Sequence, residues 1–312
     1  MHVVVDPWDP GYGVATEIDA LAESTADVEL ATEMPPAEWA PRRPGAAVVE
    51  PDSVVFVDGV RRVDARVWVG PDGTRGAAEA GLCASWAAGA VRCAAGAAEL
   101  LAAEVGHGLF SASPVASDLS TAHGTYAAQQ ARASTPEALS LALQEQMLAA
   151  ELRAAERAAA GRPALLVLDG PLRGRQHLPG AVGMIKTHHT GYLTERAAAV
   201  LAALEPGERT PAFTIGSTGW VRHSWYVRLP GPSGAPLAGV VRCECAGDVA
   251  AVALAHLADQ TAVVLPRYAS EPHKDQRAPQ NLYPIGGLER ELRRRLGDAA
   301  LLYRALRVAA AA

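Results

Sequence analysis

The chain has 312 residues, 49% of them hydrophobic, which is enough apolar material for one large domain or two modest ones. Its formal net charge of −6 argues against a protein that coats nucleic acid by bulk electrostatics, but not against an enzyme with a local basic groove. No stretch reaches the roughly 18 apolar residues that a membrane span needs. The start, MHVVVDPWDPGYG, lacks the basic and apolar regions of a secretory signal, so we expect a cytoplasmic protein.

The first half of the chain predicts an N-terminal arm followed by strands. Residues 1–50 are rich in proline and acids, and we expect a peripheral arm with little regular structure of its own, or one docked onto the main domain, residues 51–312. From Ser53 the pattern predicts two strands in tandem, VVFVDGV and RRVDARVWV, and then a third strand, CASWAAGAVRCA. The segment AAGAAELLAAEV is compatible with a helix, and GHGLFSASPVASDLSTAHG resembles a loop.

The second half alternates helices and strands. A helix is predicted over 136–160, because Thr135 suits the N-cap and Pro136 suits the first helical position. Its apolar stripe at helical spacing consists of Leu141, Leu148, Leu152, Ala155 and Ala159. Strands are expected at 164–169, 181–187, PAFTIGS, SWYVRLP and AGVVRCECA, and helices at 194–204, 248–259 and IGGLERELRRRLG. This order predicts a mixed α/β sheet, with an antiparallel meander followed by crossovers.

Two further patterns are interpreted as structural. The four cysteines form no CxxC pair, and we expect small buried hydrophobic side chains that stay reduced in a cytosol. The charged run LERELRRRLG is interpreted as the solvated face of a helix rather than a DNA-binding surface, because charge runs usually face water.

Two apolar strands each end in Asp-Gly. Asp58 follows VVFV and Asp169 follows LLVL. If the strands are neighbours, the two acids emerge close together, and two like charges at close range repel unless a cation lies between them. Carboxylate oxygens suit Mg²⁺ or Mn²⁺, and two such ions roughly 4 Å apart can activate a water and stabilise the leaving oxygen of a phosphodiester. The alternative is that each Asp-Gly merely opens a turn.

The predicted helix carries acids on or beside its apolar stripe. Glu145 falls near the middle of the stripe, Glu151 falls at its edge, and Glu156 borders it. A carboxylate there is costly without a partner, and a metal shared with Asp169 would supply one. The helical periodicity does not choose between Glu145 and Glu151.

Basic groups follow the second strand end. Lys186 ends the strand beside the expected site, where it would hold or polarise a scissile phosphate; a solvated strand end is the alternative. The late loop PHKDQRAPQNL concentrates His273, Lys274, Asp275 and Arg277. Such a loop either carries function or is anchored by its own hydrogen bonds.

The chain resembles the NurA nuclease family, whose domain has an RNase H-like fold related to the Piwi domain. The resemblance spans roughly 53–296, through VFVDGVRRVDARV, QEQMLAAELRAAE, LLVLDGPLRG, AVGMIKTHHTGYL and HKDQRAPQNLYPIGGLE in this order. It implies an RNase H-like mixed sheet with flanking helices. It also implies that Asp58, Glu151 (rather than Glu145) and Asp169 are metal-binding acids and that Lys186 is a catalytic lysine. The family's last site position is filled by Asp275 or His273, and Asp275 is preferred because an acid would complete the metal ligands.

The resemblance further implies a function. The family consists of Mn²⁺- or Mg²⁺-dependent DNA nucleases, similar to 5′→3′ exonucleases or single-strand endonucleases, which act in DNA end resection and repair as homodimers with a HerA-type hexameric ATPase. Asp58, Glu151, Asp169 and Asp275 would then hold one or two metal ions, and Lys186 would offset charge on the phosphate. The chain departs from the family at DGV, where a serine commonly follows the glycine, and in its last motif. Two alternatives remain: a non-catalytic partner of a DNA-translocating ATPase, and a metal-dependent phosphohydrolase of small phosphoesters.

Overall fold

The computed structural model describes residues 22–46, 48–71, 78–160, 165–217, 219–231 and 237–311. The chain divides into two compact units. Unit 1 comprises residues 1–56, 92–98 and 161–286, and unit 2 comprises residues 57–91, 99–160 and 287–312. The long strand β3 (Val54–Val69) begins in unit 1 and continues through unit 2.

Unit 1 is built on a mixed sheet. Its strands are β2 (Asp27–Glu29), β8 (Leu165–Asp169), β9 (Ala181–Ile185), β11 (Phe213–Ser217), β12 (Trp220–Arg228) and β13 (Val240–Ala246). Their order is β2-β11-β12-β13-β9-β8, and the start of β3 follows β8. The pairs are antiparallel except β9 and β8, which are parallel. A separate short parallel pair joins β1 (Ala22–Glu23) and β10 (Thr190–Gly191).

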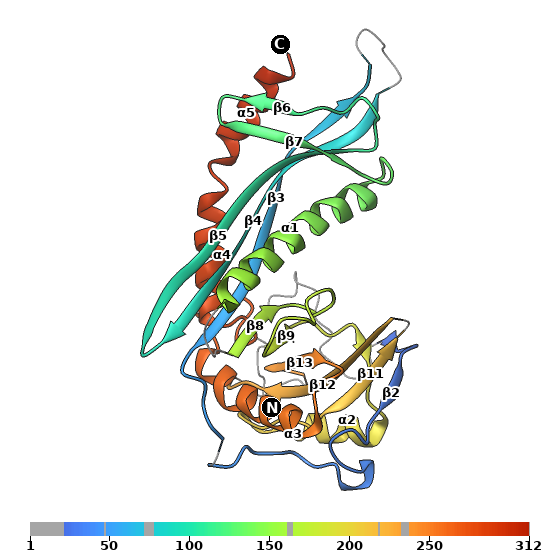
Figure 1. The fold of residues 1–312 in the computed structure, drawn as a ribbon, viewed down its shortest axis with the longest axis vertical. Helices are drawn as coiled ribbons and strands as arrows, with labels where there is room; N and C mark the ends of the chain where they lie inside the picture. The colour runs from blue at the N-terminus through green and yellow to red at the C-terminus, as the bar shows by residue number, and fades with distance from the viewer. Residues whose placement is uncertain are drawn as a thin grey trace, which may run out of the picture. The chain divides into compact units, whose positions relative to one another are not determined.

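Helices cover both faces of this sheet. Successive side chains of a strand point to opposite faces, so neighbouring residues of β12 contact different helices. Tyr226 on β12 packs with the side of α2 (Glu195–Ala202) that carries Leu201. The neighbouring Trp225 points the other way, and its Nε1 donates to Thr261 Oγ1 on α3 (Ala251–Val264) at 2.8 Å. Short 3₁₀ helices lie at Pro36–Glu38 (η3) and Leu265–Tyr268 (η4). Figure 1 shows α2 and α3 beside these strands.

The described part of the N-terminal arm docks onto unit 1. Strand β2 pairs with β11, and Trp39 is buried with its ring 6.1 Å from that of Phe213. Glu33 binds the buried guanidinium of Arg209 through both carboxylate oxygens, at 2.8 and 2.9 Å. Residues 1–21 of the predicted arm lie outside the described residues.

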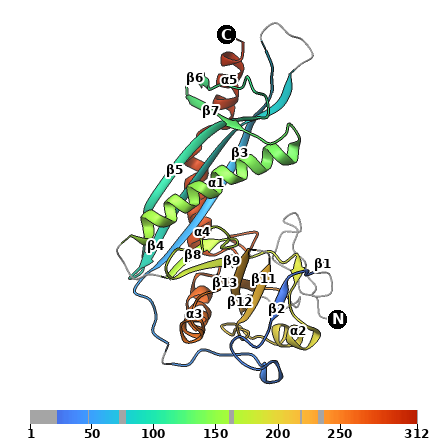
Figure 2. The same cartoon turned by 45° about the vertical axis from the view of Figure 1, so that its right-hand side comes forward.

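Unit 2 contains the long strands. After β3 come β4 (Glu79–Ala94), β5 (Ala97–Ser111), β7 (Gly124–Gln130) and β6 (Leu119–Thr121) in spatial order. On β4, Ala84 and Trp86 pack against α1 (Pro136–Ala159). The other face of β4 carries Gly89, where an added Cβ would meet Leu288 of α4 (Tyr283–Arg295) at 3.2 Å. Figures 1 and 2 show α1 along one face of β3–β5, with α4 and α5 (Ala299–Ala309) along the other.

The predicted mixed α/β sheet with flanking helices is confirmed, and four details of the prediction are wrong. The expected loop GHGLFSASPVASDLSTAHG contains the end of β5 and the whole of β6. The two tandem strands are the single strand β3. The possible helix in AAGAAELLAAEV is part of the turn and strand β5, where strand pairing outweighs the helix propensity of Ala, Leu and Glu. The buried face of α1 carries Leu139, Leu143, Met147, Ala150 and Ala154, while Leu141 and Leu148 are exposed. No described helix combines the length and the apolar character that a membrane span requires.

Candidate active site

The carboxylate of Asp169 emerges where β8 ends. Gly170 follows with φ at +90°, a conformation that glycine adopts without strain, and the chain turns there. The next residues fold back over β9, where Gly183 leaves them room: a Cβ on Gly183 would lie 2.8 Å from Leu172 N. Leu172 N donates to the buried Glu244 Oε1 at 2.7 Å. The second Asp-Gly therefore does open a turn, and this turn fixes the position of the acid.

Lys186 is held against Asp169. It follows β9, and its side chain is only 9% exposed. Its Nζ donates to Asp169 Oδ2 at 2.5 Å and to Asn281 Oδ1 at 3.0 Å. An ammonium group removed from water needs such acceptors, and two of its three hydrogens are used here. The lysine is therefore a buried partner of the acid rather than a solvated strand end.

The late loop reaches Lys186 through an amide. Asn281 is fully buried, and its Nδ2 donates to Asp275 Oδ2 at 2.6 Å. Asp275 Oδ1 accepts from the backbone N of Arg277 at 2.8 Å. A continuous chain of hydrogen bonds thus runs from Asp275 through Asn281 and Lys186 to Asp169. By contrast, the imidazole of His273 is 70% exposed and lies 3.4 Å from Glu271 Oε2.

A small pocket opens at this chain of hydrogen bonds. Its volume is about 190 Å³, and it is lined by Asp169, Gly170, Pro171, Ile185, Lys186, Thr187 and Arg277. One carboxylate and two cationic side chains therefore meet in it. Such a combination suits a phosphate group that is approached by a carboxylate-bound cation, since guanidinium and ammonium groups both bind phosphate oxygens.

Asp58 lies within β3, and here the Asp-Gly pair opens no turn, because the strand continues to Val69. Gly59 instead allows close packing: a Cβ there would lie 2.5 Å from Glu151 Oε1 and 2.9 Å from Met147 Cγ of α1. Glu151 is buried, with 3% of its surface exposed. Glu145 has 53% of its side chain exposed and lies 3.8 Å from Arg132. The structure therefore places Glu151, and not Glu145, beside the strand that carries Asp58.

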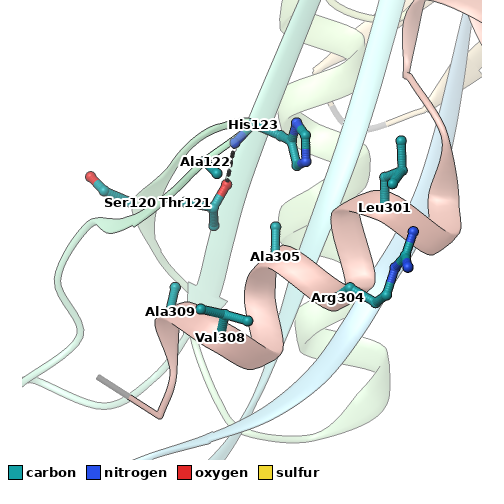
Figure 3. Close-up of a pocket in the computed structure, with 9 residues that line it drawn as sticks. All are labelled: Ser120, Thr121, Ala122, His123, Leu301, Arg304, Ala305, Val308 and Ala309. Carbon is teal, nitrogen blue, oxygen red and sulfur yellow. Dashed lines mark hydrogen bonds between the residues drawn. The ribbon is translucent and has the colours of Figure 1, made fainter.

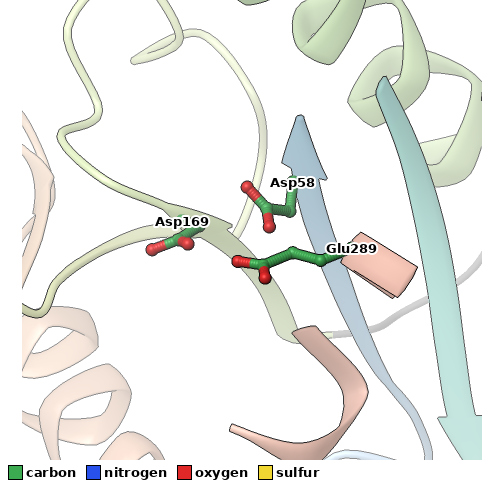
Figure 4. A group of neighbouring side chains, drawn as sticks. All are labelled: Asp58, Asp169 and Glu289. Atoms are coloured by element: carbon green, nitrogen blue, oxygen red, sulfur yellow. The ribbon is translucent and has the colours of Figure 1, made fainter. Parts of the chain in front are cut away.

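Three acids offer a set of cation ligands. Asp58, Asp169 and Glu289 each have a carboxylate oxygen, and these oxygens all lie within 4.8 Å of one another (Figure 4). Asp58 and Glu289 are buried, and Asp169 is partly buried. Like charges this close repel one another, and a cation bound between them would relieve that repulsion. Oxygen donors of this kind fit Mg²⁺ or Mn²⁺, so the residues present suit such an ion.

Sequence reasoning does not identify Glu289, Arg277 or Asn281 as site residues. Glu289 lies on α4, in the charged run that was interpreted as a solvated helix face, yet it is buried. Its neighbours in the run, such as Glu291, Arg294 and Arg295, do pair with one another at the surface. On a helical wheel of this run, Leu288 and Leu292 fall beside Glu289. These apolar neighbours are the sequence signal that indicates burial of Glu289.

Unit 2 contains a pocket that is larger than the small pocket at Asp169 and Lys186. It has a volume of about 470 Å³, and Figure 3 shows it beside the β6–β7 turn and α5. Its lining consists of Ser120, Thr121, Ala122, His123, Leu301, Arg304, Ala305, Val308 and Ala309. The lining contains no carboxylate, so it offers no ligand set for a hard cation. Size alone therefore does not identify the active site.

One family model matches part of the chain, and solved structures show weaker similarity. The family model of the NurA domain matches residues 133–284, a range that contains Glu151, Asp169, Lys186 and Asp275. The crystal structure of the NurA nuclease from Sulfolobus solfataricus is similar with a TM-score of 0.46 and 13% identity, over 84% of this chain and 86% of that chain. The catalytic domain of human Endonuclease V gives a TM-score of 0.35 and 16% identity, over 92% and 93%. No curated protein sequence matches.

Proposed function

Since residues 133–284 belong to the NurA family, as the sequence motifs predicted, we propose that this chain is a metal-dependent nuclease that hydrolyses phosphodiester bonds of DNA. The observation that carries the proposal is the pair of Asp169 and Lys186 at the small pocket, inside the residues that match the family. A carboxylate at a strand end, held by a buried ammonium group and open to a cavity, is a costly arrangement that suits a site of chemistry.

The proposed cofactor is Mn²⁺ or Mg²⁺. Asp58, Asp169 and Glu289 would hold it, because their carboxylate oxygens already lie together. When bound, such an ion activates a water for attack on phosphorus and stabilises the leaving oxygen. We place Glu151 in support of Asp58, since it packs against Gly59 on the same strand.

The chain's own cations have separate roles in this proposal. Lys186 holds the Asp169 carboxylate in place through Oδ2. Arg277 lines the pocket, with its Nε 3.8 Å from Asp275 Oδ1, and its planar guanidinium would bind the oxygens of a phosphate that enters there. Lys186 and Arg277 would then both offset negative charge on the transferring phosphate.

The finer activity is also proposed from the family. We propose 5′→3′ exonuclease or single-strand endonuclease action in DNA end resection and repair, by a cytoplasmic homodimer that works with a HerA-type hexameric ATPase. The net charge of −6 is compatible with a partner that contributes much of the DNA-binding affinity. Tight, strongly salt-dependent DNA binding by the isolated chain would count against that division of labour.

The test is degradation of DNA labelled at either end, with Mn²⁺, with Mg²⁺ and with EDTA. We expect cleavage only with a divalent ion, and release of short products from the 5′ end first. Binding to the ATPase without cleavage under any divalent ion would favour a non-catalytic partner. Turnover of nitrophenyl phosphate but not of DNA would favour a phosphohydrolase of small esters.

A further inference from the structure

The late loop carries an acid whose surroundings differ from those of a metal ligand. We propose that Asp275 is a positioning residue, which acts on Asp169 through Asn281 and Lys186, and is not itself a ligand of the metal. The inference rests on the proposed nuclease function and replaces the expectation, drawn from the family resemblance, that Asp275 completes the ligand set. It assigns Asn281 a role that the sequence motifs did not suggest.

Both oxygens of Asp275 already accept hydrogen bonds. Oδ1 accepts from Arg277 N at 2.8 Å, and Oδ2 accepts from Asn281 Nδ2 at 2.6 Å. The group of mutually close carboxylates contains Asp58, Asp169 and Glu289 but not Asp275. Asp275 is therefore directed into its own loop.

The amide of Asn281 can be used in only one orientation. Its Oδ1 faces the Lys186 ammonium, which only donates, and its Nδ2 faces the Asp275 carboxylate, which only accepts. A flipped amide would set NH₂ against NH₃⁺ and oxygen against oxygen. Because Asn281 is fully buried, water cannot replace the lost hydrogen bonds. Asp275 thus determines which atom Asn281 presents to the lysine.

Asn281 in turn fixes the ammonium group. Lys186 has a flexible four-carbon stem, so the position of Nζ depends on what it bonds. Its two acceptors are Asp169 Oδ2, at 2.5 Å, and Asn281 Oδ1, at 3.0 Å. Without Asn281, Nζ would follow Asp169 alone, and neither group would be held relative to the pocket. Polar groups behind a metal ligand commonly change activity by about 10–100-fold when they are removed.

The first experiment measures Mn²⁺ binding by electron paramagnetic resonance, which does not require nuclease activity. We expect Asp275→Asn and Asn281→Leu to weaken Mn²⁺ binding less than Asp169→Asn does, and Asp169→Asn to bind at least about tenfold more weakly than the wild type. If Asp275→Asn weakened Mn²⁺ binding as much as Asp169→Asn does, Asp275 would be a ligand and the inference would be wrong.

A charge swap tests the hydrogen-bond chain. The double variant Asp275→Asn/Asn281→Asp exchanges donor and acceptor: the amide at 275 would donate to one carboxylate oxygen at 281, while the other oxygen at 281 still accepts from Lys186. Each single variant is expected to lower kcat about 10–100-fold with little change in KM for DNA, and the double variant is expected to recover part of the loss. A ligand role for Asp275 predicts no recovery, because the carboxylate stays absent from 275.

The position of Lys186 can be followed without metal or DNA. The chain contains only two lysines, Lys186 and Lys274, and the side chain of Lys274 is 53% exposed. We expect an amine reagent to modify Lys186 far more slowly than Lys274, and Asp275→Asn or Asn281→Leu to raise the Lys186 rate, as read by mass spectrometry. An unchanged Lys186 rate would overturn the inference. A wild type that binds Mn²⁺ but cleaves no DNA would instead remove the proposed function, while this rate still decides the role of Asp275.

Discussion

The ammonium group of Lys186 lies 2.5 Å from Oδ2 of Asp169, and both side chains are largely removed from solvent. Lys186→Met should therefore lower the free energy of unfolding by about 1–3 kcal/mol in EDTA, because a buried acceptor that loses its donor keeps its desolvation cost. A cation at Asp169 would neutralise the same charge, so the loss should be smaller in Mn²⁺. Chemical denaturation under both conditions measures it. An equal loss in both would argue against cation binding at Asp169.

Gly183→Ala should disturb the turn that follows Asp169. The added Cβ would lie 2.8 Å from Leu172 N and 2.9 Å from Gly170 O, so the backbone would have to shift. We expect a destabilisation of about 1–3 kcal/mol, as for other overpacked sites, together with loss of cleavage. Gly45→Ala is the control, because a Cβ there meets nothing within 4 Å. Thermal unfolding and DNA cleavage are measured for both variants. Equal stability and equal cleavage rates of Gly183→Ala and Gly45→Ala would contradict the role given to Gly183.

The two acids of α1 should differ in their effect on cleavage. Glu151→Gln is expected to lower the cleavage rate about 10–100-fold, because this buried carboxylate packs beside the strand that carries Asp58. Glu145→Gln is the matched control on the same helix, and its exposed side chain predicts a rate close to that of the wild type. The reverse order of effects would show that the buried face of α1 has been assigned incorrectly.

The four cysteines should be inert in the native protein. All are buried, and burial raises the pKa of the Cys83 thiol and that of the Cys245 thiol to about 12. Because the thiolate is the reactive form, a thiol reagent at pH 8 should titrate none of them before unfolding and all four afterwards. Rapid reaction of a native thiol would contradict the expectation of small buried side chains.

The sequence predicted both acids at strand ends, and this is correct for Asp169 at the end of β8 but wrong for Asp58, which lies within β3. Asp58 and Asp169 each follow a run of buried apolar residues, and a polar residue after such a run is visible without a structure. The Asp-Gly dipeptide alone does not predict its structural role, because Gly59 allows close packing against α1 whereas Gly170 allows a turn. That difference arises from neighbours distant in sequence.

Other features were beyond sequence reasoning because they depend on packing. Glu289 sits among charges that face water, and only its burial separates it from Glu291. On α1, alanines make up much of the buried face, so hydrophobicity gives little contrast around the helix, and the predicted stripe includes Leu141 and Leu148, which are exposed. The amide of Asn281 carries no charge pattern, and its place between Lys186 and Asp275 appears only in the fold.

The most direct measurement is the rate of Mn²⁺-dependent cleavage of end-labelled DNA by the wild type, Asp58→Asn and Asp169→Asn. Asp52→Asn, an exposed acid near the start of β3, is the control. A bound cation contributes several kcal/mol to the transition state, so both site variants should fall by at least about 100-fold while the control keeps its rate. Wild-type rates in Asp58→Asn and Asp169→Asn would contradict the proposal that these acids hold the catalytic metal.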